Sequence, residues 1–288
     1  FLIDALSGQY VWADILEQPV NATSINTVRD QVADEVVRIL AQPYGIIQSC
    51  KTSDDDGEKA SKMDAYRCVL RFHRYWRTFD PSLFEPVRQC LEHTTLHHPF
   101  YAEAFACLSQ IYTNAFRYQH DVSRITEDPR TKALDLAFRA IELAPRSSQS
   151  YFAMGLAYWF IGDIDSSFEA YEKAHLLNPN DTKTTGELGF RYAMRMEWEK
   201  AVPLITESYD RNPGQSGTFR MGLSLYHYAE GRYDQSIIES RKIDAPNIPY
   251  QYLISAACYS RLGDTHNAQT TLAKLLEISP RFGDVIVD

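Results

Sequence analysis

The chain has 288 residues and a formal net charge of −9, and 44% of its residues are hydrophobic against 23% charged. This balance is typical of a folded protein and excludes a largely disordered one. The negative charge and the lack of a concentrated basic stretch argue against a nucleic-acid surface, so we expect protein, peptide or small-molecule partners. Apolar runs fall short of the roughly 20 residues that cross a bilayer, and no signal peptide is visible. We therefore expect no membrane insertion and a cytoplasmic location.

The N-terminal region predicts a small mixed element. The segment FLIDALSGQYVWADIL reads as two short strands joined at Ser7-Gly8, which is a hairpin signal. Apolar positions from Ile25 to Leu40 then predict a helix that ends before Pro43. One hairpin and one helix bury too little surface to fold alone.

Residues 1–49 are therefore expected to end an upstream domain or to dock on the C-terminal part of the chain. The polar residues 50–62 are interpreted as a linker. Because the chain starts at Phe1 and not at a methionine, we expect a fragment of a longer protein.

The five cysteines lie far apart along the chain, at Cys50, Cys68, Cys90, Cys107 and Cys258. Their number is odd and no C-x-x-C spacing occurs, so the pattern favours neither a disulfide framework nor a structural zinc site. We expect reduced thiols, as in a cytoplasmic compartment.

One segment carries metal-ligand side chains at helical spacing. Cys90, His93 and His97 share a helical face because offsets of three and four align, and His98 is adjacent. No matched second set of ligands follows, so we interpret these side chains as structural. The sequence predicts neither a metal site nor a cofactor.

The remainder of the chain repeats with a period of 34 residues. Prolines recur with spacings of 46, 34, 34, 33 and 34, at Pro99, Pro145, Pro179, Pro213, Pro246 and Pro280. The first interval equals one period plus twelve. A period of this length indicates helix-turn-helix repeats, in which the proline ends the second helix.

Two further positions keep the same period. A small residue stands 24 residues before the closing proline, at Gly155, Gly189, Ala256 and, with the twelve extra residues, Ser109. A tyrosine stands 21 residues before it, at Tyr158, Tyr192, Tyr259 and Tyr112. A small side chain at a helix crossing allows close approach, and a large neighbour fills the space beside it.

These markers divide residues 63–280 into about six repeats, at 64–98, 100–145, 148–179, 182–213, 216–246 and 249–280. The fifth repeat is out of register because Gly222 and Gly231 are nine residues apart, where Gly155 and Gly162 are seven apart, so we expect a remodelled turn. The second contains an insertion at 116–128, expected as an extended helix, a passive loop or an overhang. Residues 281–288 predict the start of a further capping helix, whose exposed apolar surface would permit a homodimer.

Residues 64–280 resemble tetratricopeptide repeats, which implies a mainly α fold, a right-handed α-solenoid. The segment LIDALSGQYVWADILEQPV and the following INTVRDQVADEVVRIL, within residues 2–49, are similar to the closing strands and helix of a TolB-like domain. In bacterial signalling proteins that domain lies between an N-terminal effector and a tetratricopeptide array. The resemblance implies an upstream class III adenylate or guanylate cyclase domain or, as the alternative, an upstream winged-helix domain of a transcriptional regulator; LAQPYGII at 40–47 favours the cyclase group.

In such arrays the first helices line a concave groove whose exposed side chains select the ligand. The groove candidates from this register are Gln110, Asn114, Phe152, Trp159, Phe190, Tyr228 and Tyr250. The row is aromatic and not basic, which suits an amphipathic helix from a partner, a second copy or the chain's own flanking segment. Arrays that grip a C-terminal carboxylate carry Lys, Asn and Arg where this chain has Ala106, Phe152, Leu156 and Gly186, which disfavours that class of ligand. The alternative interpretation is that single aromatics pack between repeats.

No phosphate-binding glycine motif and no nucleophile elbow occurs. The sequence thus predicts a non-catalytic interaction and regulatory region of a bacterial signalling protein. An enzyme with a site assembled across repeats is the alternative, which a deep pocket with convergent titratable groups would favour.

Overall fold

The computed structural model describes residues 2–3, 10–12, 61–118, 127–280 and 282–283. At the N-terminus, β1 (Leu2–Ile3) pairs antiparallel with β2 (Tyr10–Trp12). The turn predicted at Ser7-Gly8, the helix predicted after it and most of the 50–62 linker lie outside the described residues, so the hairpin stays a prediction. Most of the 116–128 insertion and of the 281–288 segment also lies outside them.

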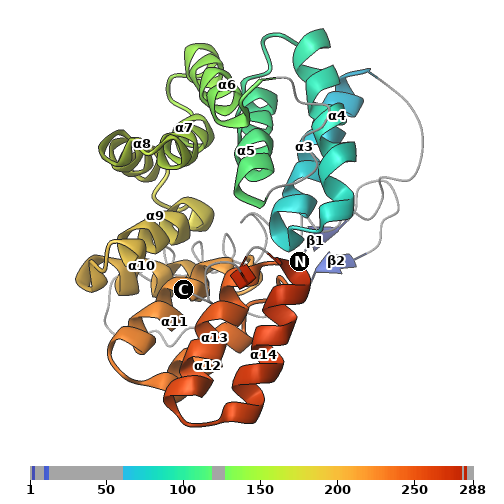
Figure 1. Ribbon diagram of the computed structural model, residues 1–288. Coiled ribbons are helices and arrows are strands. Elements are labelled where there is room, and N and C mark those ends of the chain that lie inside the picture. The colour runs from blue at the N-terminus through green and yellow to red at the C-terminus, as the bar shows by residue number, and fades with distance from the viewer. Residues whose placement is uncertain (1, 4–9, 13–60, 119–126, 281, 284–288) are drawn as a thin grey trace, which may run out of the picture.

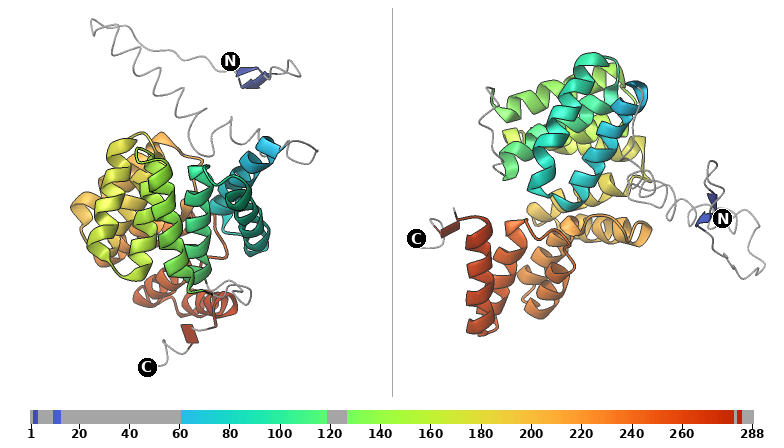
Figure 2. Two further views of the ribbon diagram at one scale, coloured as in Figure 1. Left: turned by 90° about the horizontal axis from the view of Figure 1, so that it is seen from above. Right: turned by 90° about the vertical axis from the view of Figure 1, so that its right-hand side faces the viewer.

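The described part is mainly helical and forms a solenoid of antiparallel helix pairs (Figures 1 and 2). The pairs in chain order are α3 (Ser61–Thr78) with α4 (Pro81–His97), α5 (Ala102–Tyr118) with α6 (Pro129–Leu143), α7 (Ser148–Ile161) with α8 (Ile164–Leu177), α9 (Thr182–Met194) with α10 (Trp198–Arg211), α11 (Arg220–Ala229) with α12 (Tyr233–Arg241), and α13 (Pro249–Arg261) with α14 (Thr265–Ile278). A short 3-10 helix, η1 (Gly217–Phe219), leads into α11.

Five of the six repeating prolines directly follow a helix end, as predicted. The C-cap residue immediately before the proline is His98, Ala144, Asn178, Asn212 or Ser279. Aspartates begin several of the second helices, since Asp163 accepts a hydrogen bond from the Ser166 amide at 3.2 Å. Local sequence chemistry thus fixes where most second helices start and stop.

The small residues predicted at helix crossings stand where two helices touch. A Cβ at Gly155 would lie 2.9 Å from the Tyr171 ring of α8, and a Cβ at Gly189 would lie 2.9 Å from Ile205 of α10. Ser109 of α5 donates a hydrogen bond to the Ala133 carbonyl of α6 at 2.7 Å. Close approach within each pair therefore depends on these positions.

The tyrosines of the period join successive repeats. Tyr192 of α9 donates a hydrogen bond to Glu172 of α8 at 2.7 Å, and Tyr112 of α5 donates to Glu92 of α4 in the same way. Each bond runs from the first helix of one repeat to the second helix of the repeat before it. These phenols therefore contribute to stacking as well as to filling space.

The fifth repeat carries its crossing residue two positions later than the others. Ser224 of α11 exchanges hydrogen bonds with Ser236 of α12, which lies twelve residues on, as Ser167 lies twelve residues after Gly155. Gly222 instead faces the preceding repeat, where a Cβ would lie 2.6 Å from Ile205. The two-residue shift explains the irregular glycine spacing, and both helices of this pair are short, with 10 and 9 residues.

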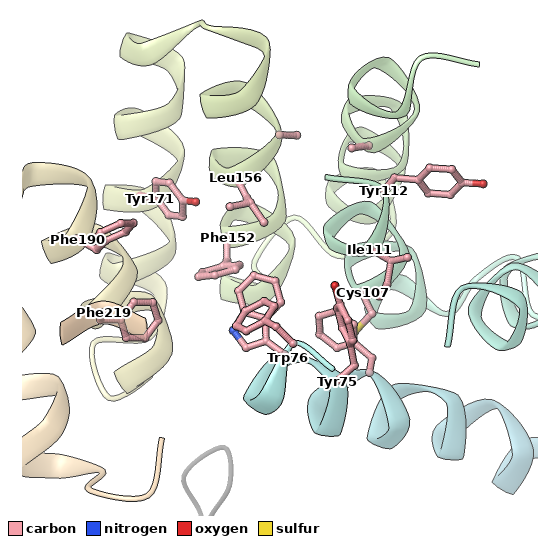
Figure 3. Packing of buried hydrophobic residues seen from close by; sticks show 14 of the residues in the cluster. Tyr75, Trp76, Cys107, Ile111, Tyr112, Phe152, Leu156, Tyr171, Phe190 and Phe219 are labelled. Carbon is pink, nitrogen blue, oxygen red and sulfur yellow. The ribbon is translucent and has the colours of Figure 1, made fainter. Parts of the chain in front are cut away.

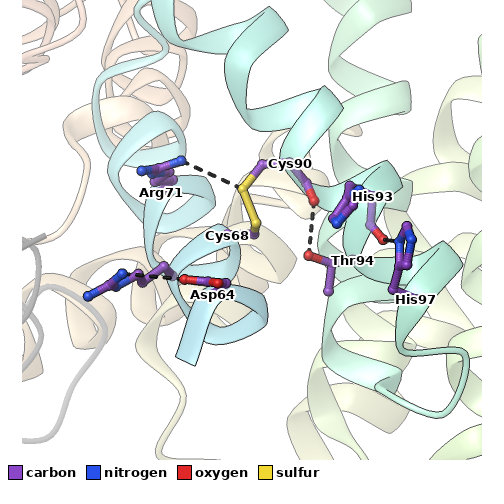
Figure 4. Close-up of a disulfide and its surroundings, with 8 residues drawn as sticks. Asp64, Cys68, Arg71, Cys90, His93, Thr94 and His97 are labelled. Carbon is purple, nitrogen blue, oxygen red and sulfur yellow. Dashed lines mark hydrogen bonds and ion pairs between the residues drawn. A yellow bond between two sulfur atoms is a disulfide. The ribbon is translucent and has the colours of Figure 1, made fainter. Parts of the chain in front are cut away.

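One prediction about the cysteines is wrong. Cys68 of α3 and Cys90 of α4 form a disulfide with a Cα–Cα distance of 5.5 Å (Figure 4). Both residues lie eleven positions from Phe79 in the turn, so the antiparallel pair brings them face to face, and this relation does not depend on an even count or a C-x-x-C motif. Cys107 and Cys258 are free and buried. The cytoplasmic location argued from reduced thiols stays a prediction.

Candidate functional site: a pocket on the concave face

The first helices of the repeats follow one another along the inside of the solenoid. Within this inner row α5 packs against α7, α9 against α11 and α11 against α13. The array curves enough that α5 and α13, far apart in sequence, line one pocket. The inner face is thus a concave surface with two parts, one covered and one open.

Helix α3 covers the part of this face near the starts of α7 and α9. Trp76 of α3 contacts Phe152 of α7 edge to face, with ring centroids 5.8 Å apart, and Phe152 contacts Tyr171 in turn at 5.6 Å (Figure 3). Phe152 and Asn114 are 0% exposed and Gln110 is 1% exposed. These three groove candidates are therefore enclosed by the chain itself and are not open to a partner in this structure.

A buried lysine of α9 contacts both α3 and α5. Lys183 of α9 donates a hydrogen bond to Gln110 at 2.7 Å, and its ammonium lies 4.4 Å from the ring centroid of Trp76 and 3.9 Å from that of Phe152. Burial lowers the pKa of Lys183 to about 8, although nearby carboxylates, Asp181 first, oppose the shift. The cation stays inside the core because aromatic faces and one amide oxygen solvate it.

The open part of the concave face is a pocket of about 290 Å³. It brings together Trp159 of α7, Phe190 of α9 and Tyr250 of α13, three of the residues predicted for the groove. The other lining residues are Arg117, Phe160, Arg191, Met194, Met221, Leu225, Leu253 and Ile254. Five inner helices thus supply the walls, which are almost wholly apolar.

Tyr228 does not reach this pocket. Its ring lies 5.5 Å from that of Tyr233, in a cluster around Ile237, Ile254 and Cys258 that adjoins the pocket through Leu225 and Ile254. The two-residue shift in the fifth repeat turns Tyr228 toward its own repeat. Met221 and Leu225 of α11 take the corresponding places in the pocket wall.

None of the eight remaining lining residues was among the groove candidates, although helical spacing marks several of them. Met194 follows Phe190 by four positions, and Leu253 and Ile254 follow Tyr250 by three and four. Residues at these offsets share a helix face. Phe190 and Tyr250 thus each belong to a longer apolar stripe on their helix.

Arg191 forms one wall of the pocket and is only 2% exposed. It forms an ion pair with Glu187, one helical turn earlier, and its guanidinium carbon lies 4.6 Å from the Trp159 ring centroid and 5.5 Å from that of Phe190. Burial is the largest single influence and opposes its charge, but Glu187 and Tyr171 together outweigh burial and raise the pKa of Arg191. Its positive charge is therefore permanent and already compensated.

Two buried tyrosines near the pocket are poorly suited to acid–base catalysis near neutral pH. Burial raises the pKa of Tyr118, whose ring contacts Arg117, to about 12. Burial raises the pKa of Tyr171 further still. Cys90, which was considered with His93 and His97 as a metal ligand, is in the disulfide, and the two imidazoles stack at 3.9 Å. Among the described residues no group of three or more His, Cys, Asp or Glu side chains is arranged to hold a metal ion.

Comparison with known proteins finds a family model that matches two stretches of the chain. The model of the tetratricopeptide repeat matches residues 148–181 and 250–282. Comparison with curated proteins gave no match. Within the part of the chain that the structure describes, no helix is both long and apolar enough to cross a membrane.

Three solved structures share the fold at low identity. The human IFIT1 dimer with m7Gppp-AAAA has a TM-score of 0.62 and 14% identity, over 86% of this chain and 56% of that one. The APC/C hetero-tetramer Cut9-Hcn1 has a TM-score of 0.59 and 16% identity, over 81% and 43%. A thermophilic TPR protein of Thermus thermophilus has a TM-score of 0.52 and 15% identity, over 70% and 99%. The helical part of this chain is therefore a tetratricopeptide-type solenoid, with matched repeats at 148–181 and 250–282.

Proposed function

We infer that this chain is a protein-interaction region that binds the apolar surface of a protein or peptide partner in the open pocket of the concave face. Tetratricopeptide-repeat proteins mediate protein–protein interactions, and the repeat fold is generally non-catalytic. The observation that carries the proposal is the convergence of Trp159, Phe190 and Tyr250 from three helices on one apolar pocket. Aromatic side chains in such a position are typical anchors for a partner side chain.

We also propose two different roles for residues of the predicted aromatic row. Phe152 belongs to the half that α3 already covers, so it serves as core. Trp159, seven residues later on the same helix, is part of the uncovered half. An amphipathic helix laid along the open half would meet mainly Trp159 and Met194 with its apolar face, because Phe190 is only 7% exposed.

A matched pair of methionines tests this proposal. Met194 lines the pocket and is 48% exposed, whereas Met196 is 73% exposed and does not line it. Met194→Lys places a charge in the pocket, and Met196→Lys places the same charge two residues away. We expect proteins captured from cells by the wild type, and then bound directly after purification, to be lost with Met194→Lys and kept with Met196→Lys. Equal binding by the two variants would overturn the assignment.

The wider setting is proposed from the resemblance of residues 2–49 to a TolB-like domain. In that setting the array is the C-terminal regulatory region of a bacterial adenylate cyclase, and partner binding changes the orientation or association of the upstream effector. Determining the coding sequence upstream of Phe1 tests it. A class III cyclase domain there supports this setting, a winged-helix domain identifies a transcriptional regulator, and any other domain overturns both.

A further inference from the structure

The pocket contains one cation that no described residue neutralises. Arg117, at the end of α5, is half-buried and lines the pocket. Its guanidinium carbon lies 4.9 Å from the ring centroid of Tyr118 and 5.8 Å from that of Phe160, and in the described part of the chain no ion pair joins it to a carboxylate. Aromatic faces attract a cation but do not cancel its charge.

The other charges at this site leave a net positive balance. Arg191 is paired with Glu187, so this pair contributes no net charge. Arg117 therefore leaves the pocket at about +1 in a chain whose formal net charge is −9. A single uncompensated cation in an apolar pocket favours a ligand that carries one negative charge, because a neutral ligand would remove water from Arg117 without replacing it.

The size and lining of the pocket limit what that ligand can be. Its volume of about 290 Å³ is at the lower end of the range for small-molecule sites. Trp159, Phe190 and Met194 offer flat aromatic and flexible thioether surfaces. These surfaces fit a single aromatic ring or a medium-length alkyl chain, and the position of Arg117 fits a carboxylate at its end.

We propose that this pocket binds a small apolar monocarboxylate, an arylalkanoate or a medium-chain fatty acid, with the carboxylate on Arg117 and the apolar body between Trp159, Phe190 and Met194. Such a ligand is additional to the protein partner proposed above. Because both would occupy the same face, the acid would compete with the partner and make the interaction responsive to a metabolite. No bond is made or broken.

The test uses the purified 288-residue chain and two acids, 3-phenylpropionate and octanoate, with their uncharged amides as matched controls. Isothermal titration calorimetry is expected to show that the acids bind, at least about tenfold more tightly than the amides. In Arg117→Gln this preference should shrink to within about twofold, whereas Arg117→Lys should keep part of it. Thermal melting by circular dichroism confirms that both variants are folded.

Three results would each overturn the proposal: neither acid binds the wild type below about 5 mM, the amides bind as tightly as the acids, or the preference for acids persists in Arg117→Gln. Met196→Lys, outside the pocket, should bind the acids as the wild type does. The titration contains no partner protein, so its failure leaves the protein-interaction proposal intact. Loss of partner capture likewise leaves the acid site intact.

Discussion

At the scale of single residues, Lys183 is the most unusual group in the core. It is 2% exposed, it lies against Trp76 and Phe152, and burial lowers its pKa to about 8 from an ordinary value of 10.5. Between these two values the unfolded chain holds a proton that the folded chain has released. The free energy of unfolding therefore rises with pH across this window. The unfolded state binds one proton more than the folded state here, so raising the pH disfavours the unfolded state.

We expect the free energy of unfolding to rise by about 1 kcal/mol between pH 7 and pH 9 because of this one group. Lys183→Met fills a similar volume without a charge, so it should abolish that part of the slope. Urea unfolding of both proteins at the two pH values measures the difference. Parallel pH dependence in wild type and variant would show that Lys183 titrates normally.

The crossing glycine Gly189 gives a second prediction at this scale. A Cβ there would lie 2.9 Å from side-chain atoms of Leu204 and Ile205 and 3.0 Å from the backbone nitrogen of Ile205. Helix propensity alone would make Gly189→Ala more stable by about 1 kcal/mol. Overpacking against α10 costs about 1–3 kcal/mol, so we expect net destabilisation in chemical denaturation, and more for Gly189→Leu. A stabilised Gly189→Ala would contradict the packing argument.

The sequence predicted the crossing glycines well, because local geometry sets their role. Gly155 and Gly189 recur with the period, and the structure places both at helix crossings. Lys183 carries no such signal, since a lysine near the start of a helix normally points to solvent. Its burial depends on Trp76 of α3, which lies 107 residues earlier in the chain (183 − 76), and no local pattern of residues contains that contact.

At the scale of elements, α3 is the feature that divides the concave face. Its apolar stripe, with Phe72, Tyr75 and Trp76 at 0–1% exposure, could be read from the sequence as one helix face. The surface beneath that stripe could not, because α3 reaches past its nearest neighbours to contact α7 and α9. For this reason Phe152 was grouped with Trp159 in the predicted groove, although only Trp159 lines the open pocket.

The Cys68–Cys90 disulfide holds α3 to α4 and gives the prediction at this scale. It closes a loop with a sequence separation of 22. Cross-linking a loop of this length stabilises the folded state by about 3 kcal/mol in the chain-entropy treatment. We expect a reducing agent to lower the denaturation midpoint of the wild type accordingly. The control is Cys68→Ser with Cys90→Ser, which should match the reduced wild type and not respond to the reductant.

At the scale of the whole molecule, burial is uneven along the solenoid. In α9 nearly every residue is buried, because α8, α10 and α11 surround it, whereas α14 packs on α13 and has Leu275 as its one fully buried side chain. Arrays of this type are stabilised by each repeat and its immediate neighbours, so an end with one neighbour opens more easily than the middle. The pocket draws on both regions, since Phe190 is in α9 and Tyr250 is in α13.

Hydrogen exchange should therefore show amides of α13 and α14 opening at a lower free energy than those of α7 and α9. Leu275→Ala removes the main contact between α14 and α13 at a cost of about 2–5 kcal/mol. In a nearest-neighbour array this loss should reduce protection in the last pair and leave α5 and α6 unchanged. Equal loss of protection in all helices would show one cooperative unit. In the expected case Tyr250, Leu253 and Ile254 form the mobile wall of the pocket, and a bound ligand or partner should raise protection in α13 before it does so in α9.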